Sequence, residues 1–350
     1  MKLSYRPEID GLRAIAVVSV ILYHAQFKFL GHDLFKGGFI GVDIFFVISG
    51  YLISSLIFKE LSLTGNFSFT HFYERRVRRI LPVLFFIMLI SILFAWIYLL
   101  PIPFVDYANS ILSSIFFISN FYFHYTETLY GTEIGLLKPF LHTWSLSVEE
   151  QFYLIFPVFI FLCFKFIKQY ITQILILGFI LSLGISHWGS YNYPSFNFYS
   201  LPTRSWELLA GIFLAKLEMN YNRSKNRYLN EILTLVGLVL IGCSIIYFDE
   251  TILHPSLYTL CPIIGVMLIL WFSNEKEFIT KLLSSKLFVG TGLISYSLYL
   301  WHFPLLAFAR TNHPSISDYD KFEILIFYNP RNIDFEFLKK AEDEDLSIIV

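Results

Sequence analysis

The stretch Gly41-Val42-Asp43-Ile44-Phe45-Phe46-Val47-Ile48-Ser49-Gly50-Tyr51 carries one charged side chain, Asp43, in otherwise largely apolar surroundings. It lies within an apolar run over residues 38–58, and an α-helix needs about 20 apolar residues to cross a bilayer. A charge inside such a helix is costly, so Asp43 is a candidate functional residue. The glycines of this region favour close packing against other helices: Gly37, Gly38, Gly41 and Gly50.

Apolar runs of similar length recur along the chain. Hydrophobic residues make up 56% of the 350 residues and charged residues 15%, whereas soluble domains average about 25% charged residues. The sequence therefore predicts an all-α fold, a polytopic transmembrane helix bundle of about nine spans. The expected spans are 10–28, 38–58, 80–100, 150–168, 171–187, 204–218, 231–248, 257–273 and 287–309.

The apolar stretch 107–121 is short and contains Asn109 and Asn120. If it does not cross the membrane, the connections rich in Lys and Arg all fall on one side, as basic loops do on the cytoplasmic side. If it crosses, every later connection changes side and this asymmetry is lost. We therefore predict a cytoplasmic N-terminus, an outer region at 101–149 and a re-entrant segment at 107–121 that packs against protein.

Two ionisable residues share one face of the first span. Arg13 and His24 are 11 residues apart, which places them about 16 Å apart along a helix axis. Histidine can act as a base or accept an acyl group; the alternative is that His24 only reaches the outer membrane interface. Asp43 is expected on the same outer side, where it could orient an imidazole or cap the start of its own helix.

Four arginines occur within five positions: Arg75, Arg76, Arg78 and Arg79. Guanidinium groups bind phosphate oxygens in a bidentate manner, so this cluster is a candidate phosphate site on the cytoplasmic side. The alternative is an ordinary positive anchor or a contact with anionic membrane lipid. A net charge of −1 gives no support for nucleic-acid binding, and the three cysteines have no metal-type spacing, so no metal site is expected.

A dense polar cluster precedes the predicted span at 150–168, and it contains Ser147, Glu149 and Glu150. A carboxylate at such a half-apolar boundary suits acid–base chemistry. Alternatively, Ser147 caps the helix and the two glutamates occupy its first turn. Two later clusters, Arg204 with Glu207 and the His302 that precedes Pro304, fit either a functional role or structural pairing.

Together, these stretches resemble the membrane acyltransferase-3 family, the O-acetylase type that modifies lipopolysaccharide, peptidoglycan and other surface glycans. The resemblance covers roughly residues 4–306. It rests on residues 6–14 through His24, Gly38–Ile53, Arg75–Arg79, His142–Tyr153, Arg204–Gly211 and Ser295–Pro304.

The resemblance implies a role for each motif. Arg13 and His24 match an arginine–histidine motif in which the histidine is catalytic. The Arg75–Arg79 cluster matches a basic motif for the acyl-CoA donor, and Ser147 and Glu149 match a Ser-x-Glu-x-x-Phe-Tyr motif needed for activity. It implies acetyl transfer from acyl-CoA, with no permanently bound cofactor, to a glycan or glycolipid acceptor. The resemblance also implies that the protein lies in the bacterial inner membrane, in contact with membrane lipid.

The C-terminal part departs from the family pattern. Relatives usually continue into another span and often into an SGNH-hydrolase-like domain, whereas residues 339–345 here are all charged except Ala341. We therefore expect a membrane domain at 1–310 and a truncated or frameshifted polar tail at 311–350, without an SGNH-like domain. The alternative functions are a membrane transporter or flippase and an inactive truncated paralogue.

Overall fold

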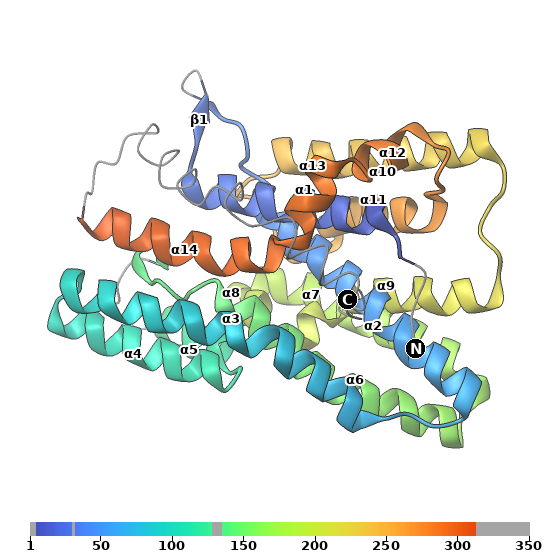
Figure 1. Ribbon diagram of the computed structural model, residues 1–350, viewed down its shortest axis with the longest axis horizontal. Helices are drawn as coiled ribbons and strands as arrows, with labels where there is room; N and C mark the ends of the chain where they lie inside the picture. Colours follow the sequence, from blue (N-terminus) through green and yellow to red (C-terminus); the bar gives the residue numbers. More distant parts are fainter. Residues whose placement is uncertain (1–4, 30–31, 128–134, 313–350) are drawn as a thin grey trace.

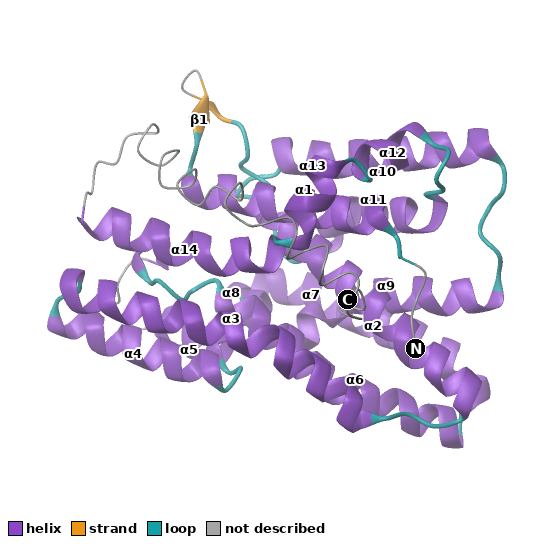
Figure 2. Cartoon of the chain, in the orientation of Figure 1, coloured by secondary structure: helices purple, strands orange, loops and turns teal. Residues whose placement is uncertain are grey.

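The computed structural model describes residues 5–29, 32–127 and 135–312 (Figure 1). It is helical throughout apart from one small antiparallel pair of two-residue strands, β1 (Lys28–Phe29) and β2 (His32–Asp33) (Figure 2). The predicted all-α class is confirmed. The helices are α1 Pro7–Ala25, α2 Gly41–Thr64, α3 Phe69–Tyr98, α4 Pro101–Ile115, α5 Ser119–Glu127, α6 Thr143–Phe166, α7 Ile171–Asn192, α8 Pro194–Tyr199, α9 Leu201–Asn220, α10 Arg227–Tyr247, α11 Leu260–Phe272, α12 Phe278–Leu283, α13 Lys286–Leu293 and α14 Ser295–Asn312.

Several of these helices are long and apolar enough to cross a membrane. Among the described residues there are five such helices, α2, α3, α6, α7 and α10, and the bent pair α13–α14 would make a sixth. The two members of that pair meet at an angle of 66°. Each of the nine predicted runs coincides with a helix or helix pair, while their number as membrane crossings stays a prediction. The chain is thus built as a multi-pass membrane protein.

The stretch predicted to be re-entrant forms a helical hairpin. Helix α4 turns back along α3, where the hydroxyls of Tyr107 and Ser91 lie 2.7 Å apart. The helix stops at Phe116, and α5 returns beside it, so that Tyr122 donates to the Asp106 carbonyl. Both ends of the hairpin therefore lie near the end of α3, and its re-entrant placement in a membrane stays a prediction. Residues 128–134, and 313–350 with nearly all of the predicted tail, lie outside the described residues.

The centre of the bundle is the contact between α2 and α9, with α7 on the other side of α9 and α1 against α2 (Figure 1). Glycines let the first two backbones approach closely, as small residues do between membrane helices. A Cβ added at Gly50 would lie 2.0 Å from the Leu208 carbonyl oxygen. One added at Gly211 would lie 2.0 Å from the Val47 carbonyl oxygen. The close-packing role predicted for Gly50 is thus confirmed.

We expect Gly211→Ala to destabilise the protein by about 1–3 kcal/mol or more, because the new methyl meets backbone that cannot rotate away. Thermal unfolding in detergent measures the effect. Gly184→Ala in α7 is the matched control, since a Cβ there meets nothing within 4 Å. Equal melting temperatures for the two variants would contradict the close approach of α2 and α9.

Helix α1 extends the length of the candidate site. It packs against α2, α13 and α14, and its first two turns are buried. The helical period carries Arg13 and His24 to the same face, one toward each end. Helix α1 therefore connects the two cavities described next.

Candidate functional site

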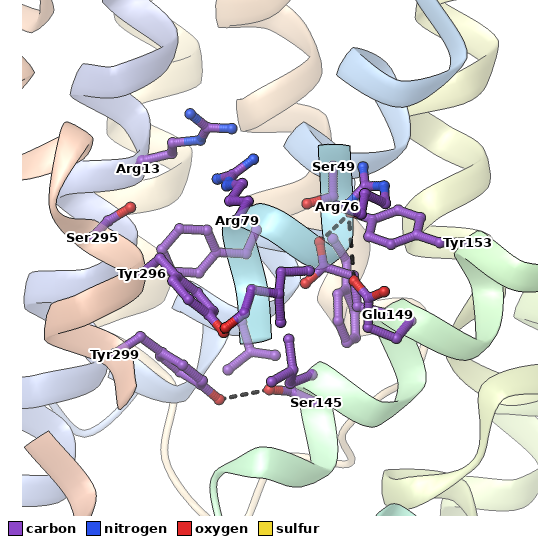
Figure 3. Close-up of a pocket in the computed structure, with 16 residues that line it drawn as sticks. Arg13, Ser49, Arg76, Arg79, Ser145, Glu149, Tyr153, Ser295, Tyr296 and Tyr299 are labelled. Carbon is purple, nitrogen blue, oxygen red and sulfur yellow. Dashed lines mark hydrogen bonds and ion pairs between the residues drawn. The ribbon is translucent and has the colours of Figure 1, made fainter. Parts of the chain in front are cut away.

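The first cavity, here called the cationic cavity, lies between α1, α2, α3, α6 and α14 and has a volume of about 90 Å³ (Figure 3). Three guanidinium groups line it, those of Arg13, Arg76 and Arg79. The positive charge of Arg79 is close enough to those of Arg13 and Arg76 to be repelled by both. The carboxylates of Glu149 and Glu150 line the same cavity. Arg13 is paired with Asp10 at 3.1 Å and Arg76 lies near Glu150, whereas Arg79 makes no ion pair with a described residue. The positive charge of Arg79 therefore favours an anionic ligand in this cavity.

The cavity brings together residues that the loop-charge pattern had placed on opposite sides. Arg76 Nη1 lies 3.8 Å from Glu150 Oε1, so the predicted separation of the arginines from the Glu149 cluster is wrong. The reason is the position of the helix ends. Helix α3 begins at Phe69, so the arginines lie within a helix instead of a loop. Glu149 likewise lies beyond the first turn of α6, which begins at Thr143.

Only half of the arginine cluster belongs to this cavity. Arg76 and Arg79 line it, whereas Arg75 is exposed and Arg78, with 78% of its side chain exposed, pairs with Glu74 at 2.6 Å. Successive residues on a helix point about 100° apart, so a run of neighbouring arginines cannot share one face. The structure thus divides the predicted donor cluster into an inner pair and an outer pair.

Tyrosines fix the charged groups within the cavity. The Arg76 guanidinium lies 3.5 Å from the centre of the Tyr153 ring, a cation–π contact. The Tyr153 hydroxyl donates to Glu149, so Glu149 is held by its own helix neighbour. On the far wall, the Tyr299 hydroxyl lies 2.6 Å from Ser145 Oγ and donates to the His142 carbonyl at 2.9 Å. Figure 3 shows this Tyr299–Ser145 contact at the other end of the cavity from Arg13.

His24 belongs to a cluster of three histidines. Its Nδ1 lies 3.1 Å from Nε2 of His302, and the His302 ring lies 5.5 Å from that of His142. Both ring nitrogens of the buried His142 lack a hydrogen-bond partner of good geometry among the described residues. Within the described part of the chain, no group of three or more His, Cys, Asp or Glu side chains is placed to hold a metal ion. The three imidazoles of the cluster are groups that can transfer a proton.

His24 also lines a second cavity, here called the histidine cavity, of about 610 Å³. Charged residues of both signs also line this cavity. Lys28 and Lys36 lie on one segment, and Asp249 and Glu250 lie on another. A roomy cavity with mixed polar walls suits a hydroxyl-rich ligand. Arg13 and His24 thus serve two different cavities from one helix.

Asp43 does not contact His24, so the predicted pairing of these two residues is wrong. It accepts a hydrogen bond from Arg204 Nη1 at 2.6 Å and lies 2.9 Å from His254 Nε2. Arg204 Nη1 also donates to Glu207 at 3.0 Å, which confirms the predicted i,i+3 pair. The side chains of Asp43, Arg204 and Glu207 are all 0% exposed. The structure therefore places Asp43 in a buried network that ties α2 to α9 and to the loop before α11.

His254 closes this network from the loop between α10 and α11. Burial, and after it the Arg204 charge, lower the pKa of His254 well below its usual 6.5. A neutral imidazole donates from Nε2 to the Asp43 carboxylate, which can only accept. Asp43 therefore orients an imidazole, as predicted, but that of a residue 211 positions away in the sequence.

Ser147 does not cap α6, because that helix begins four residues earlier and His142 occupies its N-cap position without a side-chain bond. Its hydroxyl lies 2.7 Å from Ser119 Oγ and accepts from the Ser119 backbone N–H. Ser147 thus fastens α6 to the start of α5, and it does not line either cavity. Its catalytic role stays a prediction.

The sequence named His302 as a candidate but gave no reason to place it beside His24 and His142. His302 carried the signal of a histidine before a proline within an apolar helix, yet structural anchoring explained it equally well. His142 and Tyr299 come from segments 157 residues apart. No local pattern could have joined them.

Comparisons with known proteins identify the family of the chain. The acyltransferase-3 family model, described as an acyltransferase domain, matches residues 6–314. The chain is 33% identical over 317 residues to peptidoglycan O-acetyltransferase OatA of Listeria monocytogenes, which covers 86% of this chain and 49% of that protein. No solved structure matches the chain.

Two further relatives extend the similarity. A putative O-acetyltransferase of Staphylococcus aureus is 34% identical over 321 residues, 89% of this chain and 52% of that protein. Putative peptidoglycan O-acetyltransferase YrhL of Bacillus subtilis is 33% identical over 319 residues, 86% and 49% respectively. The chain thus spans about half the length of these curated relatives. With the family match extending over nearly all of the described helices, the chain belongs to the acyltransferase-3 family.

Proposed function

We propose that this chain transfers an acetyl group from acyl-CoA to a hydroxyl of peptidoglycan. One observation carries the proposal: α1 places Arg13 in the cationic cavity and His24 at the histidine cavity. A transferase needs a site for the donor and a site for the acceptor, with a proton-transfer group between them. The names of the relatives OatA and YrhL favour peptidoglycan over lipopolysaccharide or capsule.

The donor binds through its phosphates at the cationic cavity. Arg76 and Arg79 present guanidinium forks suited to phosphate oxygens, and Arg13, which is paired with Asp10 at 3.1 Å, lines the same cavity from α1. The apolar part of the lining, which includes Phe45 and Phe46, suits the slender thioester arm. That arm extends past Tyr299 toward His24.

Transfer takes place at His24. Its imidazole takes the proton from the acceptor hydroxyl as the oxygen attacks the thioester carbonyl. A C–O bond forms, the C–S bond breaks, and the proton passes on to the leaving thiolate. The transient acyl-imidazole route, in which His24 carries the acetyl group briefly, uses the same nitrogen.

The proposal includes an orientation. The N-terminus lies in the cytoplasm, where acyl-CoA is made, and the histidine cavity opens toward the cell wall. Apart from the Arg75–Arg79 cluster, which lies within α3, the predicted asymmetry of basic connections supports this direction. The proposal also includes the bacterial cytoplasmic membrane as the location of the protein.

We expect Arg79→Gln to weaken acetyl-CoA binding by roughly 10–100-fold, because a charge-assisted phosphate contact is lost. Binding of acetyl-CoA to the purified protein in lipid nanodiscs measures this. Arg78→Gln removes the same charge from the exposed half of the cluster, and we expect a smaller loss.

The matched control is Arg227→Gln, an exposed arginine paired at 3.9 Å with Glu231 at the start of α10. It should bind acetyl-CoA as the wild type does. If Arg79→Gln and Arg227→Gln bind equally well, the cationic cavity is not the donor site.

A further inference from the structure

His302 makes two contacts that together determine where its own proton lies. Its Nδ1 is 2.5 Å from the backbone carbonyl oxygen of Tyr299, one turn earlier in α14. A carbonyl oxygen can only accept a hydrogen bond, so the hydrogen is on Nδ1. In a neutral imidazole the other nitrogen is then an acceptor, and Nε2 of His302 must carry a lone pair.

That lone pair faces His24. Nε2 of His302 lies 3.1 Å from Nδ1 of His24, and because it accepts, Nδ1 of His24 must donate. Neutral His24 then has no hydrogen on Nε2. None of the hydrogen bonds made by the described residues reaches this nitrogen, and His24 lines the histidine cavity. The atom open to a ligand is therefore the basic one.

The surroundings hold this arrangement firmly. His302 is 2% exposed, and Phe303 packs edge-on against the His24 ring with the ring centres 4.9 Å apart. Arg310, two turns further along α14, donates to the backbone carbonyl of His24. Helix α14 thus contacts the end of α1 at both the backbone and the ring of His24.

We propose that His302 is a positioning residue that fixes the tautomer of His24 and leaves its Nε2 free to act as the base. The inference rests on the proposed transfer at His24 and adds the residue that prepares it. When the acceptor hydroxyl gives its proton to Nε2 of His24, the Nδ1 proton can shift onto Nε2 of His302. The leaving thiolate then takes the proton from Nε2 of His24, and the other proton returns from His302 to Nδ1 of His24, so the pair ends as it began.

The tautomer can be measured directly. In protein labelled with ¹⁵N-histidine and held in nanodiscs, the imidazole nitrogen shifts distinguish an N–H from a bare nitrogen. His24→Ala identifies the His24 signals among those of the nine histidines by their absence. We expect His24 to carry its hydrogen on Nδ1 in the wild type. A wild-type His24 with its hydrogen on Nε2 would overturn the proposal.

Two substitutions separate positioning from packing. His302→Leu fills the space but cannot accept a hydrogen bond, and we expect loss of the Nδ1–H form together with a roughly 10–100-fold loss of acetyl transfer to muropeptides. His302→Gln can accept from Nδ1 of His24 through its amide oxygen, so it should restore both. Full transfer by His302→Leu, or no rescue by His302→Gln in a folded protein, would contradict the assignment.

The same samples keep the two proposals apart. If the wild-type protein transfers no acetyl group from acetyl-CoA to muropeptides, the proposed function fails, while the ¹⁵N shifts still decide the tautomer. If His24→Ala abolishes transfer and His302→Leu does not reduce it, the function stands and the role of His302 fails.

Discussion

Replacing His24 by alanine should reduce acetyl transfer by roughly 10²–10⁴-fold, the usual contribution of a positioned general base. The physical reason is that His24 is the histidine with an open ring nitrogen where α1 and α14 meet at the histidine cavity, among the described residues. His302 has both nitrogens engaged, and His142 is buried away from that cavity. Release of CoA and acetylation of muropeptides, both measured in nanodiscs, report the loss.

His187→Ala supplies the control for this experiment. His187 lies in α7, where its ring contacts Tyr191 and its Nδ1 has no partner among the described residues, and it lines neither cavity. Transfer by His187→Ala should match that of the wild type. A folded His24→Ala protein that acetylates at the wild-type rate would remove His24 from the mechanism.

Arg204→Met should be the most destabilising single change in the bundle, at about 3–5 kcal/mol. It leaves the carboxylates of Asp43 and Glu207 facing each other, fully buried, without the cation that joins them. It also removes a guanidinium that lies 5.2 Å from the Trp144 ring and 5.0 Å from the Phe198 ring. Loss of one partner from a buried ion pair costs far more than the pair itself contributes.

Thermal unfolding in detergent, or failure to purify a monodisperse protein, measures this effect. Arg78→Met tests the contrasting case, because its pair with Glu74 lies at the surface and such pairs contribute about 0–1 kcal/mol. Replacing both acids in the Arg204→Met background, as Asp43→Asn and Glu207→Gln, should recover part of the loss. A melting temperature for Arg204→Met equal to that of Arg78→Met would show that the network is not structural.

For Asp43, the sequence predicted the kind of partner but not which residue it is. A lone carboxylate in an apolar helix had to have a partner, because a charge in the membrane is otherwise too costly. The sequence also indicated an imidazole as the partner, but His24 was the wrong one. Asp43 pairs with Arg204 and His254 instead, and neither residue lies near it in the chain.

The cationic cavity shows a different kind of error. Positive-inside reasoning treated residues 59–79 as a cytoplasmic connection and the residues before 150 as an outer one. In the structure, α3 and α6 each begin earlier than the hydropathy suggested, so both polar clusters lie on helices. Polar residues at the end of a span blur its boundary, since they lower the local hydropathy whether or not the helix continues.

The sequence by itself determined the helices and the shared face of Arg13 and His24. Both follow from local rules, since the backbone must satisfy its own hydrogen bonds in a membrane and the helix repeats every 3.6 residues. Only the tertiary structure decided the partners: His24 with His302, 278 positions away, Asp43 with Arg204, 161 away, and Arg76 with Glu150. Such pairs depend on which helix faces pack together, and close approaches such as that at Gly211 set this packing.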